Sequence, residues 1–113
     1  MDIQLYVALD LTDDPPVVVI PKHPAVDAGN HRLTWSPIGG TTFTFDSFDP
    51  NTYPFSNVVV NANGNITANY QNRESKKEFP YVITVVAGGI KYPSSIVEPD
   101  GHIRTGGSTI KNK

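Results

Sequence analysis

Hydrophobic and polar residues alternate with a period of two in several separate stretches of the chain. Residues 3–11 carry an aliphatic side chain at every second position, and residues 41–48 alternate threonine with phenylalanine. A period of two places alternate side chains on one face of a β-strand. No stretch shows sustained apolar spacing at i, i+3, i+4 and i+7, so we expect essentially no helix.

Three further segments lie between the first two alternating stretches. Residues 17–20 are β-branched throughout and stop at Pro21, which predicts a strand covered on both faces or an edge segment packed under a loop. Residues 22–31 contain Pro24 and Gly29 and are expected to form a loop. Residues 33–35 predict a short strand that carries the only tryptophan, Trp35.

Two glycine-containing turns predict hairpins. Asn63-Gly64 separates the apolar runs 58–62 and 65–70, and this dipeptide favours a type I′ turn because both central residues need positive φ. Gly88-Gly89 separates the run 81–86 from 90–92. Short apolar runs follow at 95–97 and 102–104, so the strand pattern continues almost to the end.

These segments together predict the fold class. Seven to nine short strands with turn signals every several residues favour an all-β, antiparallel β-sandwich, immunoglobulin-like in the broad sense. A small closed barrel is the alternative. We expect one domain over residues 1–105, followed by a frayed tail over 106–113 that contains two glycines and a basic end.

Composition narrows the classes of partner. The chain has 113 residues, no cysteine, a formal net charge of −2 and a pI of about 5.8, so nothing favours nucleic-acid binding. No apolar run approaches the roughly 18 residues of a membrane helix. The first residues lack the basic and apolar regions of a signal peptide. We therefore expect a cytoplasmic chain, although a mature secreted fragment would have the same sequence features.

Common catalytic and metal-binding motifs are missing from the sequence. It has no Gly-x-Ser-x-Gly elbow, no glycine-rich phosphate loop and no His-Glu-x-x-His. His23, His31 and His102 are far apart in sequence, and we expect exposed loop histidines rather than metal ligands. No cofactor is predicted.

Acid–proline dipeptides are the remaining candidates for chemistry. Asp14-Pro15 and Asp49-Pro50 are Asp-Pro bonds, and Glu98-Pro99 is the homologue with one more methylene. A carboxylate beside proline can attack its own carbonyl, and a second acid can then activate water. Asp100-Gly101 is also labile, because glycine does not block succinimide formation. The alternative is plain strand termination, since proline cannot donate to a ladder.

Strand pairing adds a lysine to this region. If Gly88-Gly89 is the tip of a hairpin, positions that sum to about 177 face each other, which places Lys77 opposite Asp100 and Phe79 opposite Glu98. A slip of one or two residues would bring Lys77 to Glu98. In a dry setting such a lysine can lose its charge and form an isopeptide. The alternative is an exposed ion pair that contributes about 0.2–1 kcal/mol.

The chain resembles the bacterial DP-EP family, once catalogued as a domain of unknown function. The residues that carry the likeness are Phe48-Asp49-Pro50 and Val97-Glu98-Pro99-Asp100, with the run 79–85 before the last hairpin. The resemblance implies a β-sandwich with endopeptidase-like self-cleavage near the C-terminus. By this likeness Glu98 or Asp100 holds the scissile carbonyl, with Pro99 and Gly101 beside it.

The same resemblance implies roles for two other residues. Lys77 would be the amine, and Asp49 or Asp100 the acid that handles water. The chain departs from the ideal at its C-terminal site, because a Glu anhydride needs a six-membered ring where Asp needs a five-membered one. The first functional hypothesis is therefore a small domain of largely unknown role that cleaves itself by aspartic-type chemistry and has no separate substrate.

Two further hypotheses need no reaction. The chain would be a non-catalytic immunoglobulin-like binding or assembly module, which recognises a protein partner or a second copy through a sheet edge or through loops carrying Tyr53, Phe55 and asparagines. Alternatively, Trp35 and the tyrosines would bind carbohydrate, although such aromatics more often form the core.

Overall fold

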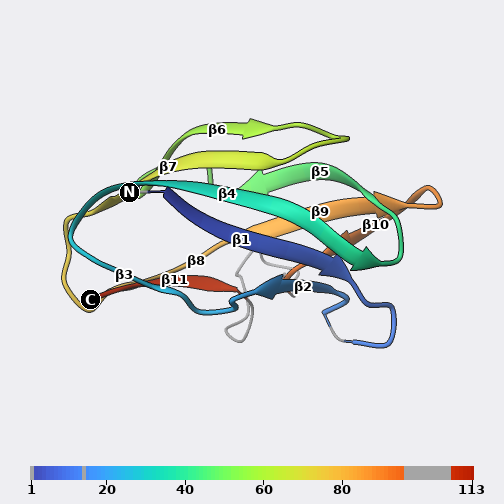
Figure 1. Ribbon diagram of the computed structural model, residues 1–113, viewed down its shortest axis with the longest axis horizontal. Coiled ribbons are helices and arrows are strands. Elements are labelled where there is room, and N and C mark those ends of the chain that lie inside the picture. Colours follow the sequence, from blue (N-terminus) through green and yellow to red (C-terminus); the bar gives the residue numbers. More distant parts are fainter. Residues whose placement is uncertain (1, 14, 96–107) are drawn as a thin grey trace, which may run out of the picture.

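The computed structural model describes residues 2–13, 15–95 and 108–113, which form an all-β protein with eleven strands and no helix (Figure 1). No helix in this part of the chain is long and apolar enough to cross a membrane. In chain order the strands are β1 (Asp2–Leu9), β2 (Val17–Ile20), β3 (Ala25–Val26), β4 (Gly29–Gly40), β5 (Thr44–Asp49), β6 (Phe55–Val60), β7 (Ile66–Asn72), β8 (Glu78–Pro80), β9 (Val82–Ala87), β10 (Ile90–Pro93) and β11 (Thr109–Asn112).

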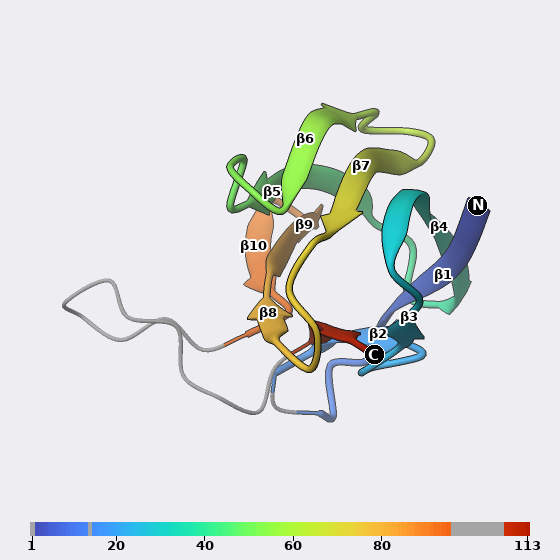
Figure 2. The same cartoon turned by 90° about the vertical axis from the view of Figure 1, so that its left-hand side faces the viewer.

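The strands form three sheets around one core. The largest sheet has the order β2-β1-β4-β7-β6, and the two smaller sheets have the orders β10-β9-β5 and β3-β11-β8. Seen from one end, the three sheets surround the interior (Figure 2). This layered all-β arrangement is consistent with a β-sandwich.

The predicted alternation decides which side chains enter the core. Along β1, Leu5, Val7 and Leu9 are buried while their neighbours are partly or fully exposed. Strand β2 lies at the edge of its sheet and exposes Ile20, which agrees with the edge alternative. The core therefore follows the period of two that the sequence carries.

Trp35 lies at the centre of an aromatic cluster. Its ring centroid is 4.9 Å from that of Phe48 and 5.3 Å from that of Tyr81. The indole Nε1 donates to the Tyr81 hydroxyl at 3.2 Å, so the polar edge of the buried ring is satisfied. Because Trp35 is 0% exposed, the hypothesis that it contacts carbohydrate is wrong.

The all-β class is confirmed, but the described residues form eleven strands rather than seven to nine, and two strand pairs are parallel. Residues 22–31, expected to be a loop, contain β3 and the start of β4, and the short strand at 33–35 extends over 29–40. Strand β4 pairs with β1 in parallel and with β7 antiparallel. Neighbours on both sides satisfy its backbone, so the strand continues through residues of weak β-propensity.

A second parallel pair joins β11 to β3, so the fold is not purely antiparallel. Parallel neighbours need a long connection between them. The chain between β1 and β4 supplies one, because it includes β2 and β3 before it returns to the other side of β1.

One of the two predicted turns is confirmed in detail. Gly88 and Gly89 have φ of +59° and +78° between the paired residues Ala87 and Ile90, as a two-residue type I′ turn requires. The second hairpin joins β6 to β7, but its loop spans residues 61–65. Asn63 and Gly64 do not have positive φ, because Asn61 closes a wider turn through backbone bonds to Gly64 and Asn65.

The prediction of a frayed tail was wrong from Ser108 onward. Strand β11 lies between β3 and β8, and its Ile110 and Asn112 are 0% and 1% exposed. Pairing on both sides satisfies the backbone, and burial of the isoleucine side chain stabilises the docked strand by about 1.5–3 kcal/mol. The folded domain therefore includes the last residues of the chain.

Candidate functional site

The pairing of β8 decides the surroundings of the predicted lysine. The hairpin register that sums to 177 holds from Ala87–Ile90 to Thr84–Pro93. On β8 the described partner strand is β11, which places Phe79 opposite Ile110. Glu98, the residue expected to face Phe79, lies outside the described residues, so that pairing stays a prediction.

The chain changes sheets at Tyr81, between β8 and β9. The Tyr81 amide donates to the Ser108 carbonyl at 3.2 Å rather than to a partner in the β9–β10 hairpin. Ser94 directly follows β10 and contacts Ile83 on β9. Its hydroxyl accepts from the Ile83 amide at 2.7 Å, and its amide donates to the Ile83 carbonyl at 2.8 Å. A hairpin register predicts pairs only as far as both strands stay in one sheet.

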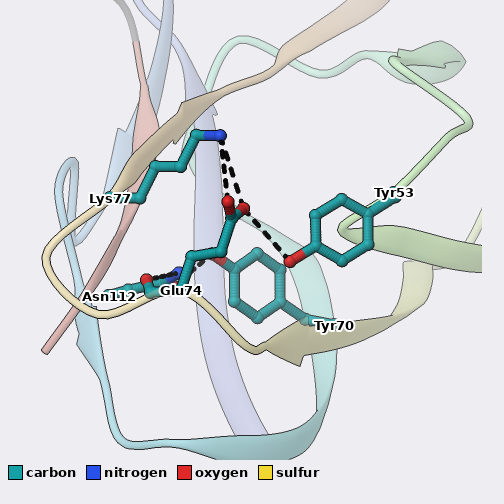
Figure 3. Close-up of polar contacts among 5 residues, drawn as sticks. All are labelled: Tyr53, Tyr70, Glu74, Lys77 and Asn112. Carbon is teal, nitrogen blue, oxygen red and sulfur yellow. Dashed lines mark hydrogen bonds and ion pairs between the residues drawn. The ribbon is translucent and has the colours of Figure 1, made fainter.

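Lys77 lies just before β8 and forms an ion pair with Glu74 (Figure 3). Its Nζ is 3.3 Å from Glu74 Oε2 and 5.1 Å from the centroid of the Phe79 ring. The lysine side chain remains 53% exposed. A half-exposed side chain beside a carboxylate is not in the dry setting that isopeptide formation requires.

Tyr53 lies on the other side of the same glutamate (Figure 3). Its hydroxyl donates to Glu74 Oε2 at 3.3 Å, and its ring packs edge-on against Phe79 with a centroid distance of 5.9 Å. Tyr53 is 47% exposed. We refer to Tyr53, Glu74, Lys77 and Phe79 as the Tyr53 patch: an aromatic and charged surface built from the segments that precede β6 and β8 and from β8 itself.

Buried hydrogen bonds fix the backbone beneath this patch. Asn112 Nδ2 donates to the Glu74 carbonyl at 2.7 Å, and the Tyr70 hydroxyl donates to Asn112 Oδ1 at 2.6 Å. Burial is the main cause that raises the pKa of Tyr70 above its ordinary value, so the phenol stays protonated and can donate. Strand β11 thus holds the loop that carries Glu74.

The other predicted site residues are not brought to Lys77 in the described part of the chain. Asp49 is exposed at the end of β5, where it pairs with Val82. In that part of the chain, the Lys77 side chain contacts Glu74 and Phe79. Glu98, Pro99, Asp100 and Gly101 lie outside the described residues, so their proposed roles stay predictions.

The described histidines do not form a metal site. Among residues 2–13, 15–95 and 108–113, no group of three or more His, Asp or Glu side chains could hold a metal ion. His23 is half-exposed and contacts Thr109 Oγ1 at 2.8 Å. His31 is buried and its Nε2 lies 2.7 Å from the Asp27 carbonyl oxygen. The expectation of an exposed loop histidine was therefore wrong for His31, which lies on the inward face of β4.

Sequence reasoning missed the partners that define the Tyr53 patch. Glu74 precedes Lys77 by three residues in a polar segment, and this spacing was the available signal. Asn112 follows Ile110 at a period of two, but the glycines and charges around it predicted a tail. Phe55, expected to be an exposed loop residue, is 1% exposed and packs in the core.

Comparisons with known proteins add no family assignment. No protein-family model matches the chain, and no curated protein matches it. The likeness to the DP-EP family therefore rests on the dipeptides described above.

Proposed function

We propose that this protein is a non-catalytic binding module that recognises a protein segment through the Tyr53 patch. The observation that carries the proposal is the placement of Lys77. Lys77, the candidate amine, is half-exposed, paired with Glu74 and packed against Phe79. These are properties of a surface that makes contacts rather than of a reactive nucleophile.

The chemistry of the patch supports this proposal. Tyrosine is enriched in binding hot spots because a rigid ring gives a large contact area at low entropic cost. Tyr53 is held from two sides by Glu74 and Phe79, so little side-chain freedom remains to be lost on binding. The adjacent carboxylate and ammonium groups provide one acceptor site and one donor site for a partner backbone or for charged side chains.

Selection of peptides tests the proposal without knowledge of the natural partner. A random peptide library displayed on phage is selected on the immobilised protein, and the affinities of selected peptides are measured by titration calorimetry. Tyr53→Ala should lower the affinity for the selected peptides by about tenfold or more, which is the effect of losing a hot spot of at least about 1.4 kcal/mol. Tyr6→Ala is the matched control, since Tyr6 is 42% exposed on β1.

Two outcomes would contradict the proposal. Peptides that bind Tyr53→Ala as tightly as the unchanged protein would place recognition elsewhere. Equal losses in Tyr53→Ala and Tyr6→Ala would show that exposed tyrosines attract peptides without a defined site.

A further inference from the structure

A second surface, separate from the Tyr53 patch, lies on the outer face of the largest sheet. Strands β4, β7 and β6 border a groove of about 410 Å³ there. Its outward-facing side chains are all polar, and we call this surface the amide groove: Asn30, Arg32, Ser56, Asn57, Asn69 and Gln71.

The register places these side chains in rows across the sheet. Arg32 on β4 pairs with Asn69 on β7, which pairs in turn with Ser56 on β6. Asn30 and Gln71 form the next row. A guanidinium, a carboxamide and a hydroxyl thus lie side by side over three strands, at the spacing of about 4.8 Å between neighbouring strands.

A β-bulge in β6 adds a further carboxamide, that of Asn57, to the groove. The register shifts between Ser56 and Val59, and Asn57 has φ of +50°. Phe55 and Val58 both pack toward the core, so one extra residue separates two inward positions. The bulge lets the consecutive residues Ser56 and Asn57 both line the groove, which a regular strand does not allow.

Three polar side chains of this groove are available to a ligand. Within the described residues, the side chains of Arg32, Asn57 and Asn69 form no hydrogen bond or ion pair with the protein, and no carboxylate lines the groove. Asp2 lies beside Arg32 on β1, on the side away from the groove, and no ion pair joins them. In the described part of the chain, a single guanidinium without an ion pair thus lies among several carboxamides.

We propose that the amide groove binds an acidic sugar, with Arg32 on its carboxylate and the carboxamides on its hydroxyl groups. An arginine matches a carboxylate through two parallel hydrogen bonds. Each Asn or Gln side chain both donates and accepts, as adjacent sugar hydroxyls require. The volume lies in the range of small-ligand sites. This route to carbohydrate uses the outer sheet face and does not involve the buried Trp35.

Titration with trigalacturonate tests the proposal. The ¹⁵N-labelled protein is titrated in parallel with trigalacturonate, neutral maltotriose and sodium sulfate, while backbone amide shifts are followed. Trigalacturonate should shift amides of β4, β6 and β7 saturably and bind at least about tenfold more tightly than maltotriose, the effect expected of one charge-assisted hydrogen-bonded pair.

Three variants assign the effect to the groove. Arg32→Gln should weaken the affinity for trigalacturonate by about tenfold or more and leave the affinity for maltotriose unchanged. Asn57→Gly removes the carboxamide but keeps a residue that tolerates positive φ. This variant should lower the affinity for both sugars. Arg73→Ala is the matched control, because it removes an arginine that does not line the groove; it should leave both affinities unchanged.

Several outcomes would overturn the proposal. They are the absence of a saturable shift up to about 10 mM trigalacturonate, equal affinities for the acidic and neutral sugars, and binding that survives Arg32→Gln. Sulfate binding as tight as trigalacturonate would mean a bare anion site. Peptide binding at Tyr53 is measured separately, so failure of one proposal is distinguishable from failure of the other.

Discussion

Replacing Tyr70 with phenylalanine tests the hydrogen bond that docks β11 beneath the Tyr53 patch. The Tyr70 hydroxyl donates to Asn112 Oδ1 at 2.6 Å, and the two residues are 0% and 1% exposed. The variant keeps the ring but leaves a buried carboxamide oxygen without its donor. Such an unsatisfied buried group costs about 1–3 kcal/mol.

The expected loss is large enough to measure. For a chain of 113 residues, a decrease of about 1–3 kcal/mol in the free energy of unfolding lowers Tm by roughly 4–12 °C. Urea denaturation followed by tryptophan fluorescence reports both the free energy and the m-value. Tyr6→Phe is the control, because Tyr6 is 42% exposed; it should change stability by less than about 0.5 kcal/mol.

A double-mutant cycle assigns the loss to the pair. Tyr70→Phe, Asn112→Leu and the combined variant should show a coupling energy of about 0.5–3 kcal/mol, because both partners share one buried bond. A loss below about 0.5 kcal/mol in Tyr70→Phe, or strictly additive effects in the cycle, would refute the inference that this bond docks the last strand.

Three further predictions follow from the same structure. Ile110→Ala should cost about 2–5 kcal/mol in a urea titration because it opens a cavity in the core, whereas a frayed tail would give almost no loss. Burial raises the pKa of Tyr81 above its ordinary 10.0, so above pH 10 this tyrosine loses its proton more readily in the unfolded chain than in the folded one. The free energy of unfolding should therefore fall above pH 10, and it should fall less steeply in Tyr81→Phe. An identical slope in the two proteins would contradict this. Intact mass after long incubation at mild acid and neutral pH should stay unchanged in the wild type and in Lys77→Ala; a species that lacks the C-terminal peptide would support self-cleavage at Glu98-Pro99 or Asp100-Gly101, and loss of one water would indicate an isopeptide.

Period-two alternation predicted the all-β class and much of the core, because burial on one face is a local property of the sequence. Residues such as Leu5, Val7 and Leu9 alternate regardless of which strand lies beside them. The Gly88-Gly89 turn was also predictable, since its backbone conformation depends on the two residues that form it.

Partners distant in sequence were not predictable in this way. The pairing of β8 with β11 joins Phe79 to Ile110 across an intervening segment, and no local pattern distinguishes it from an extended hairpin. The bond between Tyr70 and Asn112 likewise joins residues far apart in the chain. The surroundings of the candidate site therefore depend on which strand pairs with β8, and a local sequence pattern does not specify that strand.

Mapping a selected peptide onto the ¹⁵N-labelled protein shows directly whether recognition occurs at the Tyr53 patch. The largest amide shifts should cluster at Tyr53, Glu74, Lys77 and Phe79 and disappear in Tyr53→Ala, while thermal unfolding shows that the fold stays intact. Saturable shifts centred elsewhere on the molecule, or a map unchanged by Tyr53→Ala, would contradict this prediction.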